Sequence, residues 1–130
     1  MFFWRKKEKP LGQIGEDAAV KFLKKKGYKI LERNYFNKSG RRLGEIDIIA
    51  KKEKEIVFVE VKTRVMEDSA GSLPEESITP AKLHKLSKIA NSYIKLKNLW
   101  NQPFHFDAIS VRIDSENKTA KIRHLENIFI

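Results

Sequence analysis

Hydrophobic positions along the chain follow two periods, which predict helices and strands. Residues 12–26 carry apolar side chains at close to helical spacing, three lysines occupy the last turn, and Gly27 follows as a helix stop. Thr79 and Pro80 are the residue types of an N-cap and a first helical position, so a second helix is expected to begin there. Five shorter segments, alternating or rich in β-branched residues, predict strands at residues 28–36, 44–50, 56–63, 104–113 and 119–125.

The segments between these elements are polar. Residues 37–40 predict a turn, the wholly charged residues 51–55 an exposed hairpin turn, and residues 66–78 a loop. The order α-β-β-β-α-β-β favours an α/β fold in which helices cover a sheet. Because no repeat or low-complexity linker interrupts the chain, residues 1–130 are expected to form one domain. We interpret its basic N-terminal segment, residues 1–11, as an anchoring or a frayed end.

Charge narrows the possible partners. Lys and Arg number 27 against 17 Asp and Glu, and the formal net charge of +10 would attract polyanions and indicates nucleic acid. Two plainer explanations remain open, namely lysine as a solubility device and a thermophilic source. The chain has no cysteine, which excludes disulfides and thiolate metal sites. No stretch approaches the ~20 apolar residues of a membrane span. A cytoplasmic protein without a membrane partner is expected.

The strand segments 44–50 and 56–63 are expected to pair as a hairpin with Lys51 opposite Ile56. Alternation along the first strand would then place Ile46 and Ile48 on one face and its acids on the other. The register sets two further pairs opposite each other: Asp47 with Glu60, and Glu45 with Lys62.

Asp47, Glu60 and Lys62 carry the candidate chemistry. Two carboxylates directly opposite each other destabilise a sheet, and a divalent cation is the natural compensation. Mg²⁺ takes one or two carboxylates together with water and phosphate oxygens, which Asp47 and Glu60 suit. Lys62 can orient or deprotonate water or stabilise a phosphorane, so the set favours phosphodiester hydrolysis. The plainer interpretation is a charged outer face. It is disfavoured because residues 56–61 are apolar enough to be covered on both sides.

Further acids are weaker candidates. Glu16 lies in line with an apolar helical stripe, so it is either a third carboxylate of the site or an acid favourable to the helix dipole. Glu45 and Asp107 are candidates for residues that contact the metal ligands and not the metal itself. For Asp107 we favour a structural acid whose hydrogen bonds are satisfied. The three histidines, which lack metal-ligand spacing, are expected to be structural or solvated: His84, His105 and His124.

Basic residues near the hairpin are candidates for binding phosphates. Arg41, Arg42 and Arg64 flank its acidic end. Lys82 and Lys85 of the second helix form either a phosphate-binding or a solvated face. No Gly-rich phosphate loop, Ser/His/Asp set or deaminase pattern is present in the sequence.

Several motifs together resemble the YraN family of small bacterial proteins, which belongs to the restriction-endonuclease-like, PD-(D/E)xK superfamily. The resemblance covers about residues 12–129, and the order of acids and lysine is also similar to archaeal Holliday-junction resolvases. Its markers are Gly15-Glu16, Arg33-Asn34-Tyr35, Gly44-Glu45-Ile46-Asp47, Phe58-Val59-Glu60-Val61-Lys62-Thr63-Arg64, Pro80-Ala81-Lys82 and Phe106-Asp107.

The resemblance implies a mixed β-sheet flanked by helices, with four residues at the superfamily's acidic and lysine positions: Glu16, Asp47, Glu60 and Lys62. Ile46-Asp47 replaces the nominal Pro-Asp pair, but a metal needs only the Asp. The leading hypothesis is an endonuclease that uses Mg²⁺ or Mn²⁺ on double-stranded or branched DNA, with RNA left open. Asp47, Glu60 and Glu16 would hold the metal, and Lys62 would assist the nucleophile.

Two competing hypotheses stay open. One is a nucleic-acid-binding accessory protein without physiological cleavage, and the other is a structural partner in a repair or uptake complex. Paired cuts on two strands would be easiest for a two-fold homodimer, although the sequence has no clear dimer patch.

Overall fold

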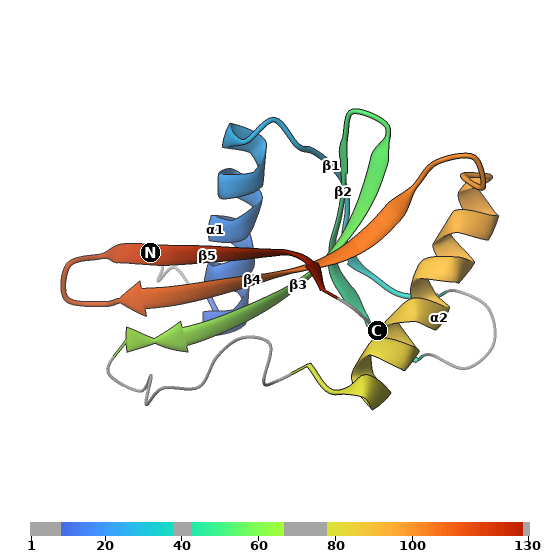
Figure 1. Cartoon of the computed structure of the whole chain (residues 1–130). Coiled ribbons are helices and arrows are strands. Elements are labelled where there is room, and N and C mark those ends of the chain that lie inside the picture. Colours follow the sequence, from blue (N-terminus) through green and yellow to red (C-terminus); the bar gives the residue numbers. More distant parts are fainter. Residues whose placement is uncertain (1–8, 38–42, 67–77, 129–130) are drawn as a thin grey trace, which may run out of the picture.

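The structure is a computed structural model that describes residues 9–37, 43–66 and 78–128 (Figure 1). It confirms the expected order of elements, with boundaries shifted by a few residues at most. The elements are α1 (Leu11–Lys25), β1 (Lys29–Tyr35), β2 (Ile46–Lys52), β3 (Glu55–Val65), α2 (Pro80–Lys97), β4 (Phe104–Asp114) and β5 (Thr119–Ile128).

The five strands form one mixed sheet in the order β1-β2-β3-β4-β5. Neighbouring strands are antiparallel except for β3 and β4, which are parallel. A parallel pair needs a long crossover, and α2 supplies it. This is the expected mixed sheet flanked by helices. None of the described helices is long and apolar enough to cross a membrane.

β3 lies at the centre of the sheet, and both of its faces are buried. Ile56 and Phe58 belong to a core cluster that includes α2, whereas Val57 and Val59 belong to a second cluster that includes α1. Because successive side chains of a strand point to opposite faces, α1 and α2 cover opposite sides of the sheet (Figure 1). We call these the α1 face and the α2 face. β3 is therefore apolar because both of its faces are covered, as its sequence indicates.

Local signals set the helix ends. The Thr79 hydroxyl accepts a hydrogen bond from the Lys82 backbone N–H at 3.1 Å, so the expected N-cap of α2 is confirmed. The C-cap of α2 is Asn98, which has the left-handed conformation with φ of 59°. Gly27, with φ of 93°, follows α1, and that backbone conformation carries little cost only in glycine.

One expected turn was too long. Lys52 pairs with Glu55, so the hairpin turn of β2 and β3 consists of residues 53 and 54 instead of 51–55. The exposed ends of these strands tolerate charged side chains because their backbone groups still pair.

Three other predictions fall wholly or largely on residues outside the described ranges. They concern the turn at 37–40, the loop at 66–78 and the N-terminal segment 1–11. Within that last segment, Leu11 already begins α1.

Candidate metal centre at the ends of β2 and β3

The β2–β3 hairpin has the expected register, from Lys52 opposite Glu55 to Ile48 opposite Val59. The described pairing stops there, and the next residue along β2 is Asp47. Its Oδ2 atom accepts a hydrogen bond from the Val61 backbone N–H at 2.7 Å. A side-chain carboxylate thus binds a β3 donor just beyond the end of the ladder, which fixes Asp47 beside Glu60.

The carboxyl groups of Asp47 and Glu60 are hydrogen-bonded to each other. Burial, this hydrogen bond and the Glu60 charge raise the pKa of Asp47 to about 9, although the Val61 N–H opposes the shift. The more distant charge of Glu16 raises it further. Two carboxylates this close do not both ionise without compensation, so the carboxyl group of Asp47 holds its proton above the usual pH range. A divalent cation could take the place of that proton.

The alternation expected for β2 fails at Asp47. Ile48 packs in the cluster on the α1 face, but Ile46 packs in the cluster on the α2 face. Two residues separated by one should share a face in a regular strand, so the expectation that they do is wrong here. The opposite strand changes face at the same level, since Tyr35 pairs with Ile46 and follows Asn34, whose φ is 51°. Asp47 therefore lies where the strand changes face.

Glu60 has a second partner, on α2. Lys82 Nζ lies 2.7 Å from Glu60 Oε2, and the Glu60 side chain is 13% exposed. Thr79 begins α2 so that Lys82 falls in its first turn, beside the end of β3. Lys82 was a candidate for binding phosphate from the solvent-facing side of the helix. In the structure it neutralises a carboxylate of the centre.

Glu16 approaches this centre because α1 packs very closely on β3. A Cβ atom on Gly15 would overlap the Thr63 side chain, so only glycine permits this approach. The next residue is Glu16, and the pKa of Asp47 responds to its charge. α1 begins at Leu11 and has no acid in its first turn, where a helix dipole acts most strongly. That position argues against the dipole as the reason for Glu16.

Two residues of β1 hold the Glu16 carboxylate. Asn34 Nδ2 donates to both of its oxygens, at 3.0 and 3.1 Å, and Arg33 Nη2 lies 3.7 Å from Oε1. Arg33 also binds Asp17 at 2.7 Å, and Lys9 together with Arg33 lowers the pKa of the Asp17 carboxyl. Asn34 has a left-handed backbone conformation, which asparagine adopts more readily than most residues do. Sequence reasoning gave Asn34 no role, although it belongs to the Arg33-Asn34-Tyr35 motif.

Lys62 is half-buried, and strand alternation places it on the face of Glu60. Within the described ranges its ammonium group has no hydrogen bond or ion pair. Glu45 directly precedes β2. Arg64 lies in β3 two residues beyond Lys62, on the same face of the strand. Lys85 is exposed on α2. Arg41 and Arg42 lie outside the described residues.

The donor set fits a hard divalent cation. Asp47 and Glu60 offer carboxylate oxygens from adjacent strands, and Glu16 is near enough to affect Asp47 electrostatically. Mg²⁺ and Mn²⁺ prefer oxygen ligands of this kind. The close approach of the Asp47 and Glu60 carboxyl groups is the observation that makes the fit specific.

Asp107 belongs to a different group, on the α1 face. It is fully buried, and it accepts hydrogen bonds from His124 Nε2 at 2.7 Å and from the Asn127 backbone N–H at 2.8 Å. His105 Nε2 lies 3.1 Å from Oδ1, the oxygen that also accepts from Asn127. These partners, and not the ligands on β2 and β3, engage the Asp107 carboxylate. They support its interpretation as a satisfied acid.

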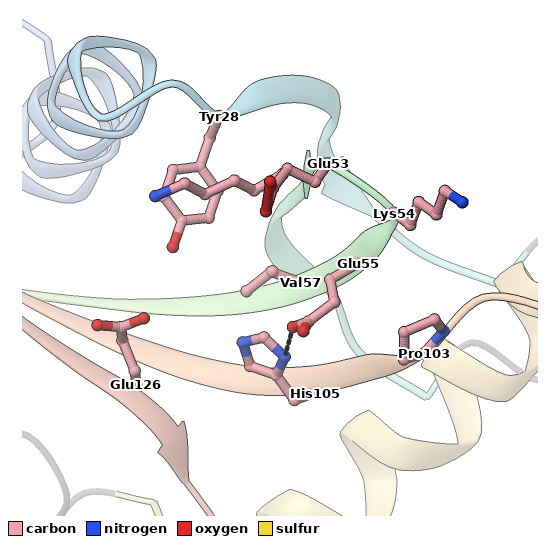
Figure 2. Close-up of a pocket in the computed structure, with 9 residues that line it drawn as sticks. Tyr28, Glu53, Lys54, Glu55, Val57, Pro103, His105 and Glu126 are labelled. Carbon is pink, nitrogen blue, oxygen red and sulfur yellow. Dashed lines mark ion pairs between the residues drawn. The ribbon is translucent and has the colours of Figure 1, made fainter.

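Asp107, His124 and Glu126 bring ligand atoms within 4.8 Å of one another, and this group could hold a metal ion. Figure 2 shows Glu126 and His105 directed into one pocket from neighbouring strands, with Glu55 paired to His105 at 2.9 Å. Lys26 Nζ lies 3.1 Å from His124 Nδ1, so the ring proton is on Nε2, facing Asp107. A metal on Nε2 would have to replace that proton. Sequence spacing missed the group because β4 and β5 assemble it.

Fold and site together define a class, an α/β protein with a restriction-endonuclease-like arrangement of a mixed sheet and two helices. Residues 15–111 match the profile of the uncharacterised protein family UPF0102, and this chain belongs to that family, which is the YraN family.

Similar proteins come from several bacteria. A UPF0102 protein of Syntrophomonas wolfei is 42% identical over 119 residues, covering 92% of this chain and 96% of its own length. A UPF0102 protein of Clostridium beijerinckii is 41% identical over 125 residues, covering 96% and 97%. One of Flavobacterium psychrophilum is 45% identical over 120 residues and covers 92% of each chain. Their names state the family and no activity.

Proposed function

We propose that this protein is a metal-dependent endonuclease that hydrolyses phosphodiester bonds in double-stranded or branched DNA. The observation that carries the proposal is the pair of Asp47 and Glu60, two carboxyl groups that lie against each other at the end of the central hairpin. A stable fold gains nothing from two opposed acids. A site that binds a cation together with a phosphate does gain from them.

Asp47 and Glu60 would hold Mg²⁺ or Mn²⁺, with Glu16 as a third carboxylate. When bound, such an ion polarises a phosphoryl oxygen and makes a nearby water a stronger nucleophile. Hydrogen bonds from neighbouring residues keep two of these acids in place. The Val61 N–H orients Asp47, and Asn34 holds both oxygens of Glu16. Fixed ligands lower the cost of reorganisation during the reaction.

Lys62 would act on the same face as Glu60. Its ammonium group can donate a hydrogen bond to the attacking water or to the phosphorane oxygen on which negative charge develops. It is available for this role because no described acid binds it. The neighbouring Lys82 is engaged by Glu60, so the two lysines have different roles.

A second function is favoured by one contact. The Lys82–Glu60 ion pair neutralises part of the acidic pair without a metal. This arrangement suits an accessory protein that binds nucleic acid and does not cleave it. The family assignment agrees with either function, because the family is uncharacterised.

The test compares two Glu→Gln variants, one at each carboxylate group. The purified chain would be incubated with linear duplex, single-stranded and four-way-junction DNA in Mg²⁺, Mn²⁺ or a chelator. We expect metal-dependent cleavage that Glu60→Gln reduces by at least about 100-fold, since it removes a ligand. Glu126→Gln is the matched control, and its activity should stay close to that of the unaltered chain.

The outcomes separate the candidate functions. Binding without metal-dependent cleavage of any substrate favours the accessory protein. Loss of activity in Glu126→Gln but not in Glu60→Gln moves the catalytic centre to the group around Asp107. Binding that does not weaken with salt argues against nucleic acid altogether.

A further inference from the structure

The C-terminal ends of β3 and β4 and the N-terminal end of β5 carry basic side chains on one face only. Thr63 contacts Gly15 of α1, and Val61, Ile113 and Ile122 pack in the cluster on the α1 face. The intervening residues therefore point to the α2 face. They are Lys62, Arg64, Ser110, Arg112, Lys121 and Arg123, and we call them the basic platform.

The strand register arranges the platform in two rows. Arg64 pairs with Arg112, which pairs with Lys121. In the adjacent row Ser110 lies between Lys62 and Arg123. Strands lie about 4.8 Å apart, and alternate residues of a strand about 6.7 Å apart. Five cationic side chains thus begin within a small area of sheet.

Within residues 9–37, 43–66 and 78–128 these charges have little compensation. Among the described residues none of the five makes an ion pair, although Lys121 is close enough to lower the pKa of Asp114. Arg112 and Lys121 are directly opposite in an antiparallel pair, where like charges destabilise a sheet. An external anion is therefore the natural partner of the platform.

Position and chemistry identify that anion. The platform begins at Lys62, two residues from Glu60, so a polyanion bound along it would pass directly over the candidate centre. In Figure 1 the ends of β3, β4 and β5 extend to the left, away from α2. The platform has no aromatic side chain, although proteins that hold single strands usually stack bases on aromatic rings. Its groups suit phosphates and not exposed bases.

We infer that the basic platform binds the phosphate backbone of double-stranded DNA and directs it to the centre at Asp47 and Glu60. The inference rests on the proposed function, because it locates the substrate of that site. It assigns binding to the sheet surface, with Arg112, Lys121 and Arg123 as residues that the sequence alone did not single out. The helix lysines, represented by Lys85, become a separate and weaker candidate surface.

Two triple variants with the same change in charge test this inference. Arg112→Gln/Lys121→Gln/Arg123→Gln removes part of the platform, and Lys29→Gln/Lys54→Gln/Lys97→Gln removes exposed lysines elsewhere. Binding of a labelled DNA duplex would be measured by fluorescence anisotropy in a chelator over a series of salt concentrations. The platform variant should lower the magnitude of the log–log salt slope by about 3, because each lost phosphate contact contributes about 1. The control should keep the slope of the unaltered chain.

A thermal melt of both variants shows whether they fold, and the platform variant should melt no lower than the control at low salt. Equal slopes for the two variants would overturn the inference, as would tighter binding of single-stranded than of duplex DNA. Failure of the proposed function gives another result, in which duplex binding depends on the platform but no cleavage occurs. Cleavage that both triple variants retain equally leaves the centre intact and removes the platform from its substrate path.

Discussion

Asp47 and Asp107 are two acids of one sheet, and the protein surrounds them in opposite ways. Asp107 is fully buried and is met by donors, two histidine rings and the Asn127 backbone N–H. Asp47 is less buried, but its nearest charged neighbour is another acid, Glu60. Burial alone would rank Asp107 as the more unusual group. Its hydrogen-bond donors nevertheless stabilise its charge better than the surroundings of Asp47 stabilise the charge of Asp47.

The difference shows which acid is free for chemistry. The donors around Asp107 satisfy its charge, so it holds β4 and β5 together. Asp47 has one backbone donor and a carboxyl group that competes for a proton, so it is ready to exchange that proton for a cation. The same residue type therefore serves structure in one place and a candidate catalytic centre in the other.

The largest expected effect comes from making the same isosteric change in both groups. Asp107→Asn turns an amide toward donors, and it should lower the free energy of unfolding by roughly 3 kcal/mol. Asp47→Asn lets the amide donate to Glu60 while its oxygen still accepts from Val61. It should leave stability unchanged or higher. Urea denaturation in a chelator at pH 7 measures both, and a loss of stability at Asp47 as large as at Asp107 would contradict the comparison.

The contact that carries Glu16 to the centre gives the next effect. Gly15→Ala should lower the free energy of unfolding by about 2 kcal/mol, because the new methyl group overlaps Thr63. Cleavage should fall as well, since α1 must move away from β3. Gly12→Ala is the control, because a Cβ there meets nothing within 4 Å. Alanine favours helix, so the control should be as stable as the unaltered protein or more stable. Equal effects of both changes would show that helix propensity, not the close approach, decides the result.

The raised pKa of Asp47 predicts a pH dependence of metal-free stability. The pKa of Asp47 rises from 3.8 to about 9 in the folded protein. Between these values the folded state binds more protons than the unfolded state, so stability falls as pH rises, by at most about 1.4 kcal/mol per pH unit. Thermal melts in a chelator would show the fall, and Asp47→Asn should flatten it. The stabilisation by added Mg²⁺ should grow with pH, because the ion replaces the proton. A stabilisation that shrinks with rising pH would contradict this.

The smallest effect is expected at Lys82, which is 45% exposed where it pairs with Glu60. Lys82→Gln should change stability by less than about 1 kcal/mol. It should tighten Mn²⁺ binding, measured by titration calorimetry, by no more than about fivefold, because the lysine no longer competes for Glu60. Lys85→Gln, an exposed lysine of the same helix, should change neither. Weaker metal binding in Lys82→Gln would mean that the lysine supports the ion.

The sequence by itself determined much of this protein because the relevant signals are local. Helical spacing, the Thr79-Pro80 start and the apolar central strand specified the order of elements. The hairpin register followed from one short turn, which placed Asp47 beside Glu60 before any fold was known. An antiparallel pair joined by two residues leaves few alternatives. The length of that turn was misjudged, because charge marks exposure and does not end a strand.

Only the tertiary structure decided what depends on distant segments. Gly15 brings Glu16 to the centre because of how α1 packs on Thr63, and the left-handed Asn34 aims its amide at that acid. The donors of Asp107 come from β5, and the platform depends on the parallel pairing of β3 with β4 across the whole of α2. No turn fixes a parallel register, which is set by the packing of both helices. The sequence thus contained the charges, and the fold decided which of them face one another.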